Sequence, residues 1–258
     1  DSASLWVRSL MPASRSRITP TSVPVSAPLM LFTSALSWSN PSPARPVTCS
    51  LDVVCLAIES RNVVVLLRRG AGGSWRLPGA AWSGRPTLSE AAAALIREAL
   101  PSDRTWHEQI GAVEAGLRSR WQGLSVVFVA LVARGAELSA GAEWCDVAKL
   151  PVRLTAHHKQ SVRAAVAHVR DRMDQAPVAF QLVPPLFTLS DLQGVYEVLL
   201  RRRLHKASFR RALRAAALVE AADDWRSDGR GRPAQLFRYA PSRRRGNIRP
   251  LHLEMPDA

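Results

Sequence analysis

The chain has 258 residues, of which 47% are hydrophobic, and it carries a net charge of +14 at pH 7 with a pI near 11.3. This length is enough for one large or two modest domains, each with its own core. The charge favours an anionic partner, with nucleic acid first and an anionic membrane surface second. The three cysteines, Cys49, Cys55 and Cys145, lack paired or metal-ligand spacing, which argues against a disulfide framework or a structural zinc site and for a reducing, cytoplasmic compartment.

Residues 1–47 are rich in Ser, Pro, Thr and Ala and show little periodicity. Their apolar stretch, Leu29–Leu36, is far too short to span a membrane, and the features of a signal peptide are missing. We interpret this segment as a disordered leader without a membrane partner, with Met11 and Met30 as alternative start sites.

From Thr48 onward, the sequence has the hydrophobic pattern of a folded domain. Leu51–Ile58 and Asn62–Leu67 are apolar and β-branched, which predicts a hairpin. A glycine-rich loop follows, and then a predicted helix from Thr87 to about Leu100. Thr87 and Glu90 have the spacing of a capping box at its start, and a proline ends it.

The next elements alternate in the same way. Glu114–Arg120 and Leu124–Ala133 predict an antiparallel pair, and Ala142–Trp144 a short strand. An amphipathic helix is expected over His157–Gln175, with a stripe of valines on one face. Adjacent histidines cannot both face one metal ion from a helix face, so we interpret His157 and His158 as the start of this helix. The pattern predicts an α+β sandwich.

Particular residues narrow this prediction. Leu66–Arg69, the glycine loop, the Trp75-x-Leu-Pro-Gly79 segment and a helix opening Thr87-Leu-x-Glu90 resemble the opening of a Nudix fold. The resemblance implies a Nudix-like α/β/α sandwich, which we place at residues 48–176.

The Nudix helix normally carries Arg-Glu-x-x-Glu-Glu, whose carboxylates hold magnesium or manganese against a diphosphate. Aligned from Leu77, these positions fall on residues 94–99, where Glu98 is the one glutamate of three that is present. Counting instead from Gly84 and Glu90 places Glu98 where the arginine belongs. Neither alignment builds a multi-carboxylate metal site, so we expect no metal, no cofactor and no catalytic residues.

The C-terminal region has a different organisation. Thr188 can cap a helix whose apolar face includes Leu192 and Leu199, and a second, basic helix is expected from about His205 to Ala217. Val219–Ala221 and Gln235–Tyr239 predict two strands joined by a glycine–arginine loop, with Trp225 bracing that wing. This order of elements is that of a winged helix-turn-helix.

The charges of this region suit double-stranded DNA. Arginine presents a rigid fork of donors that matches guanine edges or phosphate oxygens. We expect the second helix to enter the major groove and the loop to reach the minor groove. The predicted DNA-binding residues are Arg210, Arg211 and Arg214 toward the bases, Lys206 and Ser208 nearer the phosphates, and Arg230 and Arg232 in the wing.

Several of these segments together resemble the Nudix-related transcriptional regulators, the NrtR family. They are Ala179-Phe180, Phe187–Tyr196, Phe209–Arg211 and Gly229–Ala234. The resemblance implies a bacterial repressor with a Nudix-like sensor and a winged helix at residues 177–240. It also implies ADP-ribose or a related phosphorylated metabolite as the effector. We interpret the basic residues 241–258 as a disordered tail.

A diphosphate requires positive charge, which we expect from a cleft formed by Arg68, Arg69 and Arg76, with Glu98 nearby. The family's Ala-Phe-Asp-His segment corresponds here to Thr155–His158, which lacks the aromatic residue and the aspartate. The effector therefore stays open.

A winged helix reads one half-site, so we expect a homodimer on a palindrome, formed through either the 157–175 helix or a sheet edge. Two alternatives to a regulator remain. One is a Nudix-type hydrolase of a nucleoside diphosphate derivative, and the other is a protein that binds nucleic acid without sequence preference.

Overall fold

The computed structural model describes residues 48–101, 105–115, 123–173, 178–227 and 233–240. The expected leader at 1–47, the basic tail at 241–258, and Arg230 and Arg232 of the wing lie outside the described residues. Within these ranges, no helix is both long enough and apolar enough to cross a membrane.

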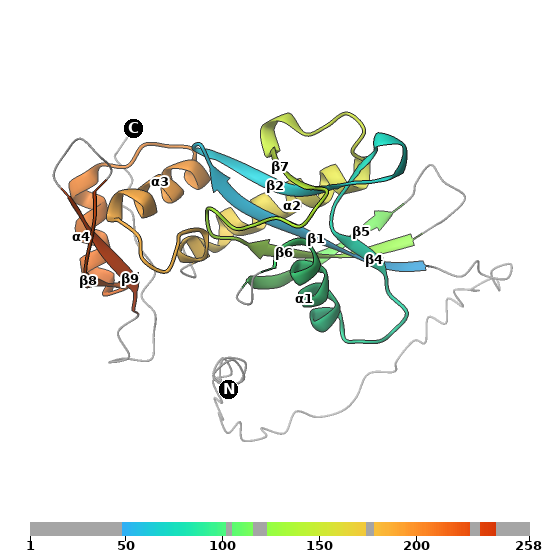
Figure 1. Cartoon of the computed structure of the whole chain (residues 1–258), viewed down its shortest axis with the longest axis horizontal. Coiled ribbons are helices and arrows are strands. Elements are labelled where there is room, and N and C mark those ends of the chain that lie inside the picture. The colour runs from blue at the N-terminus through green and yellow to red at the C-terminus, as the bar shows by residue number, and fades with distance from the viewer. Residues whose placement is uncertain (1–47, 102–104, 116–122, 174–177, 228–232, 241–258) are drawn as a thin grey trace, which may run out of the picture. The chain divides into compact units, whose positions relative to one another are not determined.

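A seven-stranded sheet forms the first part of the fold (Figure 1). Its path is β3-β2-β1-β6-β5, with β4 paired to β1 and β7 paired to β2. The β1–β2 pair is the predicted hairpin, and β1 runs parallel to β6. The strands are β1 (Thr48–Glu59), β2 (Asn62–Arg69), β3 (Trp75–Arg76), β4 (Gly79–Ala81), β5 (Trp106–Ala115), β6 (Gly123–Leu131) and β7 (Ala142–Asp146). Two 3-10 turns, η1 (Ala71–Gly73) and η2 (Val147–Lys149), follow β2 and β7.

Helices α1 (Leu88–Ala99) and α2 (Ala156–Arg172) cover opposite faces of this sheet. Side chains alternate along a strand, so the odd-numbered residues Val53 and Cys55 of β1 pack with α1, whereas Val54 and Leu56 pack with α2. The result is the α/β/α sandwich predicted from the sequence. The predicted capping box is also present, with Thr87 and Glu90 exchanging hydrogen bonds at the start of α1.

The strand expected at Glu114–Arg120 is wrong in position, since β5 begins eight residues earlier at Trp106. β5 is an edge strand with charged residues and a register shift between Gln109 and Gly111. Polar edge positions and a bulge both interrupt the alternation of apolar and polar residues that identifies a strand. Residues 116–120 of the expected strand lie outside the described residues.

The second part of the fold is a winged helix. It contains the 3-10 segment η3 (Val178–Leu182), helices α3 (Leu189–Leu200) and α4 (Lys206–Ala216), and strands β8 (Val219–Arg226) and β9 (Ala234–Tyr239). The strand expected at Val219–Ala221 is longer than predicted. Phe187 adds a third strand position, because its backbone exchanges hydrogen bonds of 3.0 and 2.8 Å with that of Phe237.

The two parts share apolar packing. The buried cluster on the α2 face of the sheet continues through η3 into the winged helix. Phe180 in η3 lies 5.8 Å from Phe187 and 4.6 Å from Tyr239, measured between ring centroids. The boundary proposed near residue 176 therefore does not separate two independent cores.

Candidate nucleic-acid interface and sensor residues

Helix α4 is fixed to the protein by an apolar stripe. Phe209 and Leu213, one turn apart, are buried, and the Phe209 ring packs edge-on against Tyr196 of α3 at 5.4 Å. Aromatic pairs in this geometry add roughly 0.5–1.5 kcal/mol to the effect of burial alone. The packing sets which side of α4 faces away from the core.

The opposite side of α4 is basic. Arg211 and Arg214, three residues apart, are exposed, and Lys206 is exposed at the start of the helix. Arg210 and Ser208 are half-buried. The structure thus brings the five predicted residues onto one helix, but its outward face is centred on Arg211 and Arg214, with Arg210 at the edge.

The wing is attached to α3 by charge. Arg226 in β8 forms an ion pair of 3.0 Å with Asp191 in the first turn of α3. Arg238 in β9 pairs with Glu220 in β8, also at 3.0 Å. Trp225 does not brace the wing as expected, because its side chain is 57% exposed. At the Trp225 end of β8 the strand pairing is shifted, so the alternation that would bury this residue is lost.

Asp191 also completes the predicted cap of α3. Thr188 Oγ1 accepts a hydrogen bond from the Asp191 amide, and Asp191 Oδ2 accepts one from the Thr188 amide at 2.9 Å. Burial acts to raise the pKa of the Asp191 carboxyl, but hydrogen bonds from Arg226 and Thr188 outweigh it and hold that pKa below its usual value. The carboxylate is therefore ionised at neutral pH.

Glu197 plays a similar role at the turn between α3 and α4. Its carboxylate accepts hydrogen bonds of 3.0 Å from the Leu204 amide, from Gln193 Nε2 and from Arg61 Nη2. Burial acts to raise the pKa of Glu197, but these donors outweigh it and lower the pKa. One side chain thus holds the turn that precedes α4 and connects it to the tip of the β1–β2 hairpin.

The three arginines expected to form a diphosphate cleft lie on two faces of the sheet. Leu66 packs on the α1 face and Leu67 on the α2 face, so Arg68 and Arg69 continue onto opposite sides. Arg68 forms an ion pair with Glu98 of α1, and Arg76 is its cross-strand partner. These three predicted residues therefore share the α1 side.

Arg69 has other partners on the opposite face. Its guanidinium donates two hydrogen bonds of 3.0 Å to Glu143 and stacks 4.3 Å above the Trp75 ring. It does not line a cleft together with Arg68 and Arg76, and the expectation that all three do is wrong. The alternation of side chains along β2 explains the difference.

The carboxylates of α1 form no candidate metal site within the described residues. Glu90 is used by the capping box, and Glu98 pairs with Arg68.

A different cluster of potential metal ligands lies between β1 and α2. Asp52, His157 and His158 each place one ligand atom within 4.8 Å of the others. Asp52 accepts a hydrogen bond of 2.6 Å from Ser125 and lies 3.6 Å from His158 Nε2. Burial acts to raise the pKa of Asp52, but hydrogen bonds from His158 and Ser125 outweigh it and lower the pKa.

We interpret this cluster as structural rather than as a metal site. The histidines lie in the first turn of α2, as predicted, where the positive end of the helix dipole disfavours a cation. Burial and the neighbouring His158 lower the pKa of His157. We interpret the contact between Asp52 and His158 as an anchor of α2 on β1. It joins residues that are more than a hundred positions apart, and no local pattern of the sequence indicates it.

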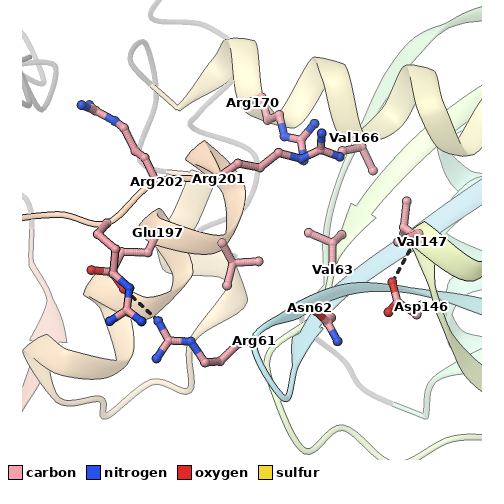
Figure 2. A pocket seen from close by; sticks show the side chains of 13 residues that line it. Arg61, Asn62, Val63, Asp146, Val147, Val166, Arg170, Glu197, Arg201 and Arg202 are labelled. Carbon is pink, nitrogen blue, oxygen red and sulfur yellow. Dashed lines mark hydrogen bonds and ion pairs between the residues drawn. The ribbon is translucent and has the colours of Figure 1, made fainter. Parts of the chain in front are cut away.

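A cavity of about 510 Å³ lies beside the turn between α3 and α4 (Figure 2). Its walls come from the β1–β2 hairpin, η2, α2, α3 and that turn. Five arginines line it: Arg61, Arg170, Arg201, Arg202 and Arg203. The site could not be predicted from the sequence, because its arginines come from three separate segments.

Comparison with known proteins places the winged helix in a family. Residues 179–239 match the NrtR DNA-binding winged helix domain. The C-terminal domain is thus similar to the NrtR winged helix. The resemblance to Nudix-related transcriptional regulators inferred from the sequence is thereby confirmed, and so is the order of a Nudix-like fold followed by a winged helix.

Individual relatives extend the similarity upstream of this NrtR-type winged helix. The ADPR responsive transcriptional repressor NtrR of Acinetobacter baylyi is 28% identical over 213 residues, covering 78% of this chain and 83% of that protein. The crystal structure of Shewanella oneidensis NrtR complexed with a 27mer DNA is 25% identical, with a TM-score of 0.67 over 75% of this chain and 94% of that one. Another crystal structure of Shewanella oneidensis NrtR is 23% identical, with a TM-score of 0.64 over 75% of this chain and 94% of that one, and supports the fold.

Proposed function

We propose that this protein is a DNA-binding transcriptional repressor that inserts α4 into the major groove. The observation that carries the proposal is the exposed basic side of α4 within an NrtR-type winged helix. The name of the Acinetobacter relative and the DNA complex of the Shewanella protein support it.

The exposure of each side chain suggests its role on DNA. Arg211 and Arg214 point away from the core, so we assign them to guanine edges, where arginine binds two acceptors at once. Arg210, Lys206 and Ser208 flank this face, and we assign them to phosphate oxygens. Arg230 and Arg232 remain proposed contacts of the wing.

We assign the Nudix-like domain a regulatory role, with ADP-ribose or a related phosphorylated metabolite as the effector. Arg68 and Arg76 share the α1 face of the sheet, where a diphosphate could replace Glu98 as the partner of Arg68. The name of the Acinetobacter relative, an ADPR responsive repressor, supports this effector.

We also propose that this domain does not hydrolyse its ligand. The carboxylates that hold catalytic metal ions in Nudix enzymes are reduced here to Glu98, which is engaged by Arg68. Incubation of the protein with ADP-ribose and Mg²⁺ or Mn²⁺ should release no AMP, measured by chromatography against a known Nudix hydrolase. Metal-dependent release of AMP would instead make the protein an enzyme.

Fluorescence anisotropy of the full chain tests the regulator. The probe is the DNA upstream of its own gene, with scrambled duplex as competitor, titrated with and without ADP-ribose. We expect selective binding that ADP-ribose weakens. Selective binding that is indifferent to ADP-ribose would retain the regulator and remove this effector. Equal affinity for both duplexes would contradict the proposed function.

A further inference from the structure

We propose that a phosphate-bearing ligand binds in the cavity beside the turn between α3 and α4, held by Arg61, Arg170 and Arg201. This is a second anion site, separate from the Arg68 and Arg76 face of the sheet. The site itself stands on its geometry, whereas its effect on DNA binding rests on the proposed function.

The charges of the cavity are unbalanced. Five arginines and two carboxylates line it, Asp146 and Glu197. Both carboxylates are already engaged, because Asp146 accepts a hydrogen bond from the Ala148 amide and Glu197 has three donors. Among the described residues, Arg201 and Arg202 have no carboxylate within ion-pair distance. An anionic ligand would supply the missing charge.

Arg170 and Arg201 point toward each other, although both are positively charged (Figure 2). Arg170 is held in place by a hydrogen bond of 2.8 Å from its Nε to the Leu199 carbonyl oxygen. Burial and the nearby charge of Arg201 lower the pKa of Arg170. Two guanidinium groups in this arrangement repel each other. An anion between them would relieve this repulsion, and their planar forks match phosphate oxygens.

Two of the three arginines occupy unfavourable backbone conformations. Arg61 in the hairpin tip has φ of 65°, and Arg201 at the end of α3 has φ of 54°. Glycine and asparagine fill such positions most readily, and other residues are strained there. The presence of arginine at both strained positions indicates that the two guanidinium groups are needed there.

The position of the cavity would couple the ligand to DNA. Arg201–Arg203 form the turn that precedes α4, and Glu197 holds that turn through the Leu204 amide. The same carboxylate pairs with Arg61. A phosphate that draws Arg61 and Arg201 toward Arg170 would compete with this pair and shift the support of α4.

The lining also indicates what part of the ligand is recognised. None of the thirteen lining residues, all in the described part of the chain, is aromatic. A nucleobase would find no ring on which to stack, so recognition is of phosphate groups. The volume of about 510 Å³ lies within the usual range of small-molecule sites. Pyrophosphate and tripolyphosphate are therefore suitable probes.

Isothermal titration calorimetry of the full chain with pyrophosphate and tripolyphosphate tests the site. Arg201→Gly removes one guanidinium while keeping a residue that favours positive φ. Arg170→Gln removes the second. The matched control is Arg163→Gln, an exposed arginine on the same helix as Arg170 that does not line the cavity. Thermal unfolding of each variant verifies that it is folded.

We expect saturable binding of both probes that each cavity variant weakens at least tenfold and that Arg163→Gln changes by less than twofold. Absence of saturable binding to the wild type would overturn the proposal. If Arg163→Gln weakens binding as much as the cavity variants do, binding depends only on the net positive charge of the protein, and the proposal is wrong. If Arg68→Gln abolishes binding and Arg201→Gly leaves it intact, the phosphate binds at the sheet and the proposal is wrong.

DNA binding by the same variants separates the two sources of phosphate. If the ligand is free in solution, Arg201→Gly leaves the salt dependence of DNA binding unchanged. If the cavity holds a backbone phosphate, the slope of log K against log salt falls by about one unit in this variant. If the wild type shows no selective DNA binding, the proposed function is wrong, but the pyrophosphate site is unaffected.

Discussion

At the residue scale, Gly79 shows how one side chain would disturb two parts of the fold. Gly79 pairs with Asp52 between β4 and β1. A Cβ at this position would lie 2.4 Å from Asp52 Oδ1 and 2.8 Å from the Leu51 carbonyl oxygen. Backbone cannot yield as a flexible side chain can, so the glycine of the Leu-Pro-Gly segment is required by close approach.

We therefore expect Gly79→Ala to lower the free energy of unfolding by about 1–3 kcal/mol, the usual cost of overpacking. Gly194→Ala is the matched control, because Gly194 lies inside α3 with no atom within 4 Å of the added Cβ. That change should raise stability by about 0.5–1 kcal/mol through helix propensity. Urea denaturation followed by circular dichroism measures both, and destabilisation by both variants alike would contradict the steric argument.

Arg210 and Arg211 offer a second comparison, since neighbouring residues on α4 differ in exposure. We expect Arg211→Ala to cost about 1–3 kcal/mol on the operator and to relax its sequence preference, as for a lost base contact. Arg210→Ala should weaken all duplexes alike and reduce the salt slope by about one unit. Anisotropy titrations over a salt series distinguish them, and interchanged behaviour would place α4 in the groove at a different rotation.

Some of these residues could be predicted from the sequence, and others could not. The basic residues of α4 follow from its helical period, because Phe209 and Leu213 identify the buried stripe. The opposite orientation of Arg68 and Arg69 also follows from the alternation of side chains along a strand. The prediction that both line one cleft did not take this alternation into account. The contact between Asp52 and His158 depends on which strand receives α2, and that is decided by the tertiary fold.

At the scale of elements, two carboxylates of α3 organise the winged helix. Asp191 connects the start of the helix to β8, and Glu197 connects its last turns to the segment before α4. Helix α3 thus positions both the wing and the recognition helix. The caps of α1 and α3 could be predicted from Thr-x-x-Glu and Thr-x-x-Asp spacing, since they depend on four consecutive residues. The start of β5 could not, because its polar edge and bulge hide its period.

Asp191→Ala should lower the free energy of unfolding by about 1–2 kcal/mol, because the cap and the ion pair are lost together. Asp224→Ala, an exposed aspartate on β8, is the control of equal charge and should have little effect. The folded pKa of Asp191 is lowered, so its contribution is complete above the unfolded pKa of about 3.9 and disappears as pH falls through the folded pKa. The difference between wild type and Asp191→Ala should therefore be constant near pH 7 and shrink in acid. A difference that grows in acid would contradict this sign.

At the scale of the whole molecule, the net charge and the continuous buried cluster both fit the proposed regulated binding of DNA. A net charge of +14 would attract DNA from a distance, and the basic side of α4 would determine the orientation in which DNA approaches. The buried cluster that runs from the α2 face through η3 packs the Nudix-like domain against the winged helix. A ligand bound to the Nudix-like domain would therefore act through packed side chains rather than through a linker.

One winged helix contacts a single half-site, so we expect selective repression to use two copies of the chain on a palindrome. We expect light scattering to show a homodimer in solution and two chains on each operator. Destroying one half-site should reduce affinity by at least tenfold, because the second winged helix then contacts DNA without base recognition. A full operator bound by one chain, with affinity unchanged when a half-site is scrambled, would contradict the dimer. In that case the wing and the arginines of α4 would have to supply all of the specificity from one side of the duplex.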